Sequence, residues 1–231
     1  LCAEHLATNG YIKDISFSLQ KGEILGFFGR SGSGKNTLPK ALFGIEPLTN
    51  GKIFVDRLPA QINSPEDALS LGLAYITDER VDCGLFSNLD LLENVYSIKE
   101  NGLGHFWAHT KLEYQRYYRY MKKLDLDLNP ASTPTRLSGG EQQKLIMMRW
   151  FMSPARIFIF NEPTQSIDIP SKIDVYNMFN DLILKGASIL IFSSNLEELM
   201  GICDRVIFIK DGTISGEISY SESPSSVQNL I

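Results

Sequence analysis

The stretch GRSGSGKNT at residues 29–37 constrains the fold of this chain more than any other. An apolar run of strand length precedes it at residues 23–28, and residues 38–43 follow with helical spacing. Glycines let successive backbone N–H groups turn inward into an anion-sized nest, and the positive end of the following helix points at the same place. The order of strand, glycine-rich loop and helix therefore predicts a phosphate-binding loop, in which Lys35 adds a full positive charge.

One position in this loop departs from the motif. The residue after the lysine should be Ser or Thr, whose hydroxyl is a ligand of Mg²⁺, but Asn36 stands there. Its amide offers an oxygen on a longer side chain, so we expect a weakened Mg²⁺ site. We expect the phosphates to contact the loop residues Gly29, Ser31, Gly32, Ser33, Gly34, Lys35, Asn36 and Thr37.

Composition limits the class of protein. The 231 residues are 43% hydrophobic and 21% charged, which is ordinary for a soluble globular chain, and no run approaches about 18 apolar residues. A net charge of −5 disfavours a general nucleic-acid binder. The cysteines Cys2, Cys83 and Cys203 are scattered without metal spacing, so we expect reduced thiols. Because the sequence begins with Leu1 and not with Met, we expect a piece of a longer protein.

Strands and helices alternate before and after a central segment at about residues 80–135, which has a different pattern. Ile15, Phe17 and Leu19 alternate with polar residues, which predicts a half-buried antiparallel strand. Residues 49–51 predict a turn before a strand at residues 52–55. Further expected elements are a helix at 64–72, strands at 73–77, 156–160, 188–192 and 205–209, helices at about 170–185 and 195–202, and an Asp-Gly hairpin at 211–212 into a strand at 213–218.

The segment at about 80–135 is helical in pattern and rich in aromatic and basic residues, among them Trp107 and Tyr117. Such interleaving is found in stacking platforms for single-stranded nucleic acid. We favour the alternative, an amphipathic helix whose aromatic residues face a core. His105 and His109 lie four apart without a third ligand, so we interpret them as surface residues.

Pro39 conflicts with the helix expected after the loop. A proline inside a helix removes a hydrogen bond and costs roughly 3 kcal/mol, whereas the first turn tolerates it. We favour a kink over a late helix start.

A second glycine-containing motif, LSGGEQQK, lies at residues 137–144. Ser138 can cap a helix and the glycines expose backbone N–H groups, which predicts another anion-binding helix terminus. With this motif the chain resembles an ATPase domain of ABC transporters over about residues 10–218. In that family the signature contacts the γ-phosphate of ATP bound on a partner domain, which implies this role for Ser138, Gly139 and Gly140.

Other family positions carry substitutions. The stretch RIFIFNEPT at residues 156–164 resembles Walker B, with Asn161 in place of the aspartate that holds Mg²⁺. Glu162 keeps the place of the carboxylate that polarises the attacking water. Ser194 takes the place of the switch histidine, and Asp78 that of the Q-loop glutamine.

These substitutions point to a subgroup. Ser-Ser-Asn at residues 193–195 and Asp-Glu-Arg at 78–80 resemble the second ATPase half of tandem sugar importers of the ribose/galactose type, where the second half is the weaker nucleotide site. Residues 166–168 resemble the family's D-loop. Tyr11, which lies 24 residues before Lys35, is the candidate for stacking on adenine.

We therefore expect an α/β fold of the P-loop NTPase type, with a RecA-like parallel core, an antiparallel β lobe and an inserted helical subdomain. The expected boundaries place the core and β lobe at residues 1–79 and 141–219, the helical subdomain at 80–140, and a loose tail at 220–231.

The resemblance implies an ATP-binding domain that powers an importer for sugars or a related small solute, with ATP and Mg²⁺ as cofactors. Two such domains close head-to-tail around two ATP molecules. The implied partners are a second ATP-binding domain, as a tandem half or a homodimer, and transmembrane permease subunits that dock near residues 78–92. The implied location is peripheral, on the cytoplasmic face of the cell membrane, and no nucleic acid is expected.

Two alternatives stay open. One is a regulatory half that binds ATP, completes the partner's site and hydrolyses little. The other is a soluble ABC ATPase of DNA repair or translation. Net acidity argues against both soluble types, and the roughly 100 residues between Lys35 and Ser138 leave no room for the long coiled coil of the repair type.

Overall fold

The computed structural model describes residues 1–77, 84–99, 102–103, 110–165 and 167–219. Its contacts divide the chain into two compact units. The first comprises Leu1–Tyr75, Arg156–Glu162 and Phe179–Ile231, and the second comprises Ile76–Ala155 and Pro163–Met178. The sequence-based domain boundaries differ from this division, because they place residues 76–79, 141–155 and 163–178 with the core, and they stay a prediction.

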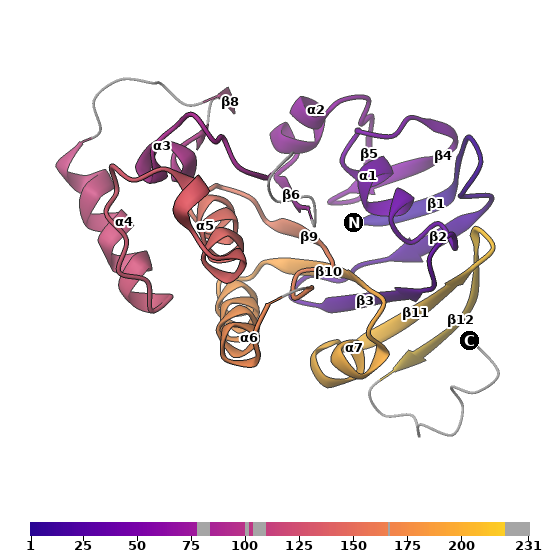
Figure 1. Cartoon of the computed structure of the whole chain (residues 1–231). Coiled ribbons are helices and arrows are strands. Elements are labelled where there is room, and N and C mark those ends of the chain that lie inside the picture. Colours follow the sequence, from indigo (N-terminus) through magenta and orange to yellow (C-terminus); the bar gives the residue numbers. More distant parts are fainter. Residues whose placement is uncertain (78–83, 100–101, 104–109, 166, 220–231) are drawn as a thin grey trace. The chain divides into compact units, whose positions relative to one another are not determined.

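A six-stranded sheet runs through the first unit in the order β12-β11-β3-β10-β9-β6 (Figure 1). The strands β11, β3, β10 and β9 pair in parallel, and β12 pairs antiparallel with β11. Every residue of β6, β9 and β10 is buried, as continuous apolar runs require in a sheet covered on both faces. The bounds are β3 Ile24–Gly29, β6 Leu73–Ile76, β9 Ile157–Asn161, β10 Ser188–Ser193, β11 Arg205–Lys210 and β12 Thr213–Ser219.

The predicted hairpin at the end of this sheet is confirmed. Asp211 and Gly212 have φ angles of 50° and 80°, and Lys210 pairs with Thr213 across them. Two consecutive residues with positive φ are typical of a type I′ turn, whose twist matches that of the flanking strands.

A four-stranded antiparallel sheet has the order β2-β1-β4-β5, formed by β1 Cys2–Thr8, β2 Ile15–Ser18, β4 Leu48–Val55 and β5 Leu58–Ala60. The turn predicted at residues 49–51 is wrong, because these residues lie inside β4. Gly51 has a φ of 103°, and a Cβ there would lie 2.6 Å from the carbonyl oxygen of His5. The register between β1 and β4 shifts on the neighbouring residues, so the glycine marks a β-bulge.

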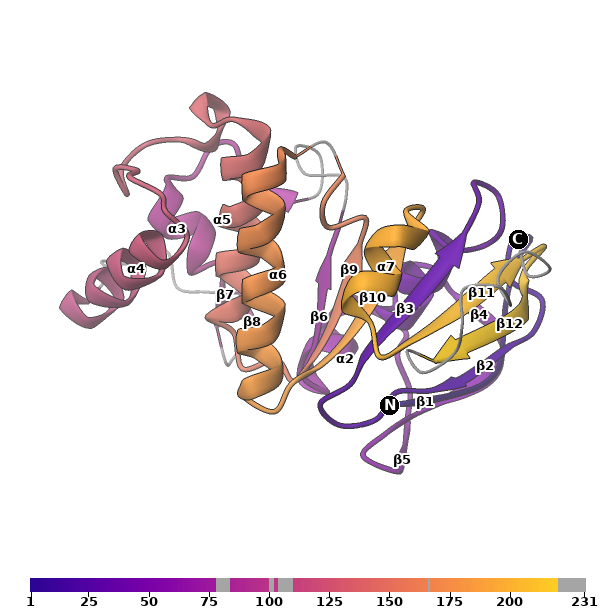
Figure 2. The same cartoon turned by 90° about the horizontal axis from the view of Figure 1, so that it is seen from below.

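In the described part of the first unit, three short helices lie wholly within it: α1 Thr37–Leu42, α2 Pro65–Ser70 and α7 Leu196–Ile202. Ser64 and Asp67 form a capping box that starts α2. α7 lies against β3, β10 and β11 (Figure 2). The close approach uses Gly26, since a Cβ on it would lie 2.9 Å from the Sγ of Cys203.

The kink that we favoured at Pro39 is wrong. α1 begins at Thr37, so Pro39 is its third residue and lies in the first turn. The first N–H groups of a helix have no intrahelical acceptor, and the missing N–H of proline therefore breaks no bond there.

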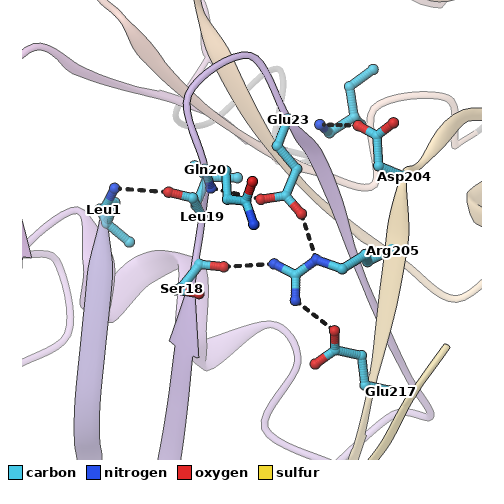
Figure 3. A network of polar contacts seen from close by, with 9 residues as sticks. Leu1, Ser18, Leu19, Gln20, Glu23, Asp204, Arg205 and Glu217 are labelled. Atoms are coloured by element: carbon cyan, nitrogen blue, oxygen red, sulfur yellow. Dashed lines mark hydrogen bonds and ion pairs between the residues drawn. The ribbon is translucent and has the colours of Figure 1, made fainter. Parts of the chain in front are cut away.

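Arg205 is the centre of a polar network that joins the two sheets of the first unit (Figure 3). From β11 its guanidinium contacts the carboxylates of Glu23 and Glu217 and donates to the carbonyl oxygen of Ser18 in β2 at 2.8 Å. Close by, the N–H of Ile24 donates to Asp204 at 2.8 Å. The hydrogen bond with Glu23 is the main cause that raises the pKa of Arg205, so the network stabilises the charged guanidinium.

The second unit is mainly helical. It contains α3 Leu91–Val95, α4 Lys111–Lys123, a 3-10 turn at Pro134–Arg136, α5 Gly139–Phe151 and the first part of α6 Ile169–Leu184. A small sheet that the sequence did not predict pairs β7 Ile98–Lys99 with β8 Gly102–Leu103. None of the helices in the described residues combines the length and the apolar character that a membrane span requires.

A buried arginine fixes the loop before α3. Arg149 donates to the carbonyl oxygens of Asn94 and Gly84, both at 2.7 Å, and its guanidinium lies 5.3 Å from the ring centre of Phe86. Burial lowers the pKa of Arg149 to about 10. The side-chain amide of Asn94 accepts the N–H of Phe86 and donates to the carbonyl oxygen of Phe86, both at 2.9 Å, so the backbone that carries the half-exposed Phe86 ring is hydrogen-bonded on both sides.

The prediction that the aromatic residues of the helical segment face a core holds only in part. Tyr117 and Met121 are buried on one face of α4, whereas Tyr114 and Tyr118 are 40% and 54% exposed. The ring of Tyr118 packs edge-on against that of Tyr117, with the ring centres 5.6 Å apart, so the two exposed tyrosines lie at the rim of the buried face. The predictions for Phe106, Trp107, His105 and His109, and for the tail at 220–231, fall outside the described residues.

Candidate functional site

Three parallel strands end at one edge of the six-stranded sheet, and each is followed by a predicted site residue. The glycine-rich loop follows β3, Glu162 follows β9, and Ser194 follows β10. Because the carboxyl ends of parallel strands meet at the same edge, residues far apart in the sequence converge there.

The loop has the open conformation that its glycines predict. Gly32 and Gly34 have φ angles of 84° and 100°, in the left-handed region that other residues rarely adopt. The N–H of Ser33 donates to Arg30 at 3.1 Å, and the N–H of Gly212 donates to Ser33 at 2.9 Å, so both ends of the bend are fixed. Among the described residues, the backbone N–H groups of Gly32, Gly34 and Asn36 have no hydrogen-bond acceptor, so they are available to a ligand.

Lys35 is buried in this loop and makes an ion pair with Glu162. The exposed fractions of the two side chains are 4% and 10%. The Nζ atom contacts Oε1 of the carboxylate, so an acidic group neutralises the lysine at the place where the motif predicts a phosphate. A charge pair at this depth requires both partners, because removing one leaves the other buried and unpaired.

Glu162 adopts a backbone conformation that is unusual for its residue type. Its φ is 46°, in a region that costs a non-glycine residue roughly 1–2 kcal/mol. Its own N–H donates to Phe192 of β10 at 2.8 Å, and its Oε1 accepts the N–H of Ser194 at 2.9 Å. The strain is thus held by contacts with the neighbouring strand, and it aims the carboxylate at Lys35.

Sequence reasoning missed Ser193 as a site residue. Its hydroxyl lies 3.4 Å from Glu162 and 3.5 Å from Glu198, and it accepts the N–H of Asn195 at 3.1 Å. The signal was the parallel pairing of β9 and β10, which puts the last residue of one strand beside the end of the other. Ser194 contacts Glu162 through its backbone, and its side chain is exposed.

The two predicted Mg²⁺ positions hold amides. Asn161 is the last residue of β9 and is 1% exposed, and Asn36 is the N-cap of α1 without a side-chain capping bond. Carboxylate and hydroxyl oxygens are the usual protein ligands of Mg²⁺, and an amide brings no charge. The nearby carboxylate of Glu162 is already neutralised by Lys35. Within the described residues there is no group of three His, Cys, Asp or Glu side chains that could hold a metal ion. The residues present therefore fit Mg²⁺ poorly.

Tyr11 lies beside the phosphate loop through its backbone. A Cβ at Gly34 would come within 2.8 Å of the Tyr11 carbonyl oxygen, and the Tyr11 side chain is 59% exposed. A cavity of about 300 Å³ is lined by residues 28–33 of the loop and by residues 208–211. The loop therefore borders open space, with an exposed aromatic ring on a neighbouring residue.

The signature residues belong to the second unit, where they begin α5. Ser138 is the N-cap, and its hydroxyl donates to the carboxylate of Glu141 at 2.7 Å. The same hydroxyl oxygen accepts the backbone N–H of Glu141 at 3.3 Å. Gly139 and Gly140 form the first turn. This capping box confirms the predicted helix terminus. Asp78 lies outside the described residues.

Comparison with known proteins identifies the family. A sequence model described as "ABC transporter" matches residues 12–165. The Bacillus licheniformis "Ribose import ATP-binding protein RbsA" is 35% identical over 220 residues, which cover 93% of this chain and 44% of the relative. A protein of the same name from Oceanobacillus iheyensis is 34% identical over 225 residues, covering 96% of this chain and 45% of the relative. The chain therefore spans less than half the length of these relatives.

Solved structures show the same fold. A nucleotide-free ATP-binding cassette from an ABC transporter superposes with a TM-score of 0.84 at 20% identity, covering 100% of this chain and 98% of the other. A dimeric bacterial ABC transporter cassette gives 0.81 at 19% identity, covering 96% and 99%. The predicted α/β fold, a parallel core with an antiparallel sheet, is confirmed. The chain belongs to the ABC transporter family, as an ATP-binding domain with the P-loop of that family.

Proposed function

We propose that this chain is the ATP-binding domain, or half of one, that powers an importer for a sugar or a related small solute. The observation that carries this proposal is the buried Lys35 in an open phosphate loop, within a chain whose relatives at 34–35% identity are named as ribose import proteins. The proposed location is peripheral, at the cytoplasmic face of the cell membrane.

In this proposal ATP displaces Glu162 from Lys35. The β- and γ-phosphates take over the contact with the lysine and accept hydrogen bonds from the free N–H groups of the loop. Most of the attraction for the phosphates comes from the lysine and these N–H groups. Tyr11 stacks on adenine. Glu162, released but held by Ser193 and the N–H of Ser194, becomes the carboxylate that polarises the attacking water.

A second ATP-binding domain completes each site. Ser138, Gly139 and Gly140 present the start of α5 to the γ-phosphate of ATP on that partner, which is a tandem half or a second copy of the chain. Closure of the pair drives transmembrane permease subunits. These dock near Asp78 and the loop before α3, where Arg149 supports the exposed Phe86.

We further propose that hydrolysis at this chain's own phosphate loop is slow. Amides at Asn36 and Asn161 replace the groups that would hold Mg²⁺, the ion that neutralises charge on the phosphates when it is bound. Loss of one supporting group around a metal typically costs about 10–100-fold in affinity or activity. The same two amides favour a second candidate function, a regulatory half that binds ATP without turnover.

Single-turnover kinetics on the paired domains test this proposal. The double variant Asn36→Ser with Asn161→Asp should raise the rate by about 10²-fold or more, provided that a partner signature is supplied. The matched control is Asn180→Asp, which changes an exposed amide in α6 to a carboxylate and should leave the rate unchanged. Rapid hydrolysis by the unmodified site, abolished by Glu162→Gln, would contradict the weakened site.

A further inference from the structure

In the second unit, the first turns of α5 meet the start of α6 at two places. The first lies at Gly140, where a Cβ would come within 3.2 Å of Ser171 Oγ and 3.5 Å of Asp168 Oδ1. The second lies one turn further along α5, where Lys144 Nζ contacts Asp174 Oδ2 at 2.6 Å. Residues three and four apart share a helix face, so the two contacts lie one above the other on facing sides of the helices.

Hydrogen bonds within the first turn of α6 hold Asp168 in place. The carboxylate of Asp168 accepts the N–H of Ser171 at 3.2 Å, and its carbonyl oxygen accepts the N–H of Lys172 at 3.1 Å. Hydrogen bonds from Ser171 hold the pKa of the Asp168 carboxyl below its ordinary value, and the charge of Lys144 lowers it further. The carboxylate of Asp168 is therefore held in place by the first turn of α6 and carries a negative charge.

The lysine side is buried and has two acceptors. The side chain of Lys144 is 10% exposed, and Nζ also donates to the carbonyl oxygen of Leu124, just after α4, at 2.9 Å. Leu124 ends α4 and Asp174 lies in α6, so one ammonium group ties α5 to both neighbours. A buried ammonium is costly without acceptors, which makes the geometry of this arrangement specific.

We propose that Lys144 and Asp174 are positioning residues for the signature turn at Ser138, Gly139 and Gly140. The pair sets the depth and direction of the first turn of α5, and with it the amides that the proposed function assigns to the partner's γ-phosphate. The inference rests on that proposed function. Binding of nucleotide to this chain's own phosphate loop does not depend on the pair, because Lys35 and its loop belong to the first unit.

The test compares Lys144→Met, which keeps the length but removes the charge, with Lys144→Arg, which keeps the charge. Lys122→Met is the control, because it removes an exposed lysine from the last turn of α4. Hydrogen exchange of the full chain is followed in a peptide covering residues 137–145 and in one covering the phosphate loop. We expect Lys144→Met to speed exchange in the first peptide about tenfold or more and to leave the second unchanged.

A second measurement follows function. ATP-driven association is measured with the chain carrying Glu162→Gln, and affinity for a fluorescent ATP analogue is measured on the chain alone. A misplacement of about 1 Å costs about 10²-fold, so Lys144→Met should weaken association by about 10–100-fold, with nucleotide affinity within about twofold. Lys144→Arg should restore most of the association, which a general loss of stability would not predict.

The outcomes separate the two proposals. If Lys144→Met matches Lys122→Met in exchange and in association, the positioning role is overturned and the proposed function stands. If the wild-type chain binds no nucleotide, the proposed function fails, and the exchange experiment alone decides the positioning role. If two copies of the wild-type chain do not associate with ATP, the partner is a tandem half and not a second copy, and the exchange experiment alone decides the positioning role.

Discussion

At the scale of single residues, Glu162 combines a left-handed backbone with a buried ion pair. Both features cost free energy unless the surroundings compensate, and here the compensation comes from Lys35 and from β10. The carboxylate of Glu162 neutralises the ammonium group of Lys35. Phosphate and carboxylate therefore compete for the same Nζ atom.

This competition gives a prediction for Glu162→Gln. The variant should bind a non-hydrolysable ATP analogue at least about tenfold more tightly, which corresponds to about 1.4 kcal/mol. The nucleotide-free chain should be less stable by about 1–3 kcal/mol, because Lys35 loses its counter-charge but can keep a hydrogen bond. Isothermal titration and urea unfolding measure the two effects.

Glu198→Gln is the control for that prediction, since Glu198 lies 3.5 Å from Ser193 Oγ and is not the ion-pair partner of Lys35. Its nucleotide affinity should stay close to that of the wild type. An unchanged or weaker affinity in Glu162→Gln would mean that the ion pair does not oppose nucleotide binding.

At the scale of elements, α4 carries four tyrosines, of which one is buried, one is partly buried and two are exposed. Tyr117 is 0% exposed, and its hydroxyl has no hydrogen-bond partner among the residues that the structure describes. Burial raises the pKa of Tyr117, which keeps the hydroxyl neutral in the folded chain. A buried polar group without a partner costs about 1–3 kcal/mol, so this hydroxyl weakens the element that carries it.

Removing that hydroxyl should therefore stabilise the chain. We expect Tyr117→Phe to raise the free energy of unfolding by about 1 kcal/mol. Tyr118→Phe, on the exposed face, should change it by less than about 0.5 kcal/mol. Urea unfolding of both variants, with equal slopes, checks this. A loss of stability in Tyr117→Phe would show that the hydroxyl has a partner outside the described residues.

At the scale of the whole molecule, the sequence predicts what local chemistry dictates. The phosphate loop, the capping box at Ser138 and the hairpin at residues 211–212 follow from residues that are neighbours in the chain. Gly51 was misinterpreted as a turn because a positive φ serves a turn and a bulge equally well, and only the strand opposite decides between them.

Contacts between distant residues were harder to predict. The ion pair of Lys35 with Glu162, the contact of Ser193 with Glu162, and the face of α4 that is buried all depend on which strands and helices become neighbours. The family resemblance implies the role of Glu162, but it carries no information on the contact of Glu162 with Lys35. Composition and periodicity do not encode such pairings.

The network around Arg205 shows how much one such long-range pairing contributes to the first unit. Arg205→Met removes the partner of Glu23, whose side chain is 8% exposed, and should lower the free energy of unfolding by about 3–5 kcal/mol. Adding Glu23→Gln should recover part of that loss, because the uncompensated carboxylate is then gone. Glu217→Gln is the control, since the side chain of Glu217 is 42% exposed and its pair is worth about 0–1 kcal/mol.

The raised pKa of Arg205 means that its contribution to stability is fully present below the pKa of the unfolded chain and is lost only as the pH rises above that value. The loss in Arg205→Met should therefore be the same throughout the neutral pH range. Urea unfolding at several pH values measures it, and equal stabilities of Arg205→Met and the wild type would show that the network does not join the two sheets energetically.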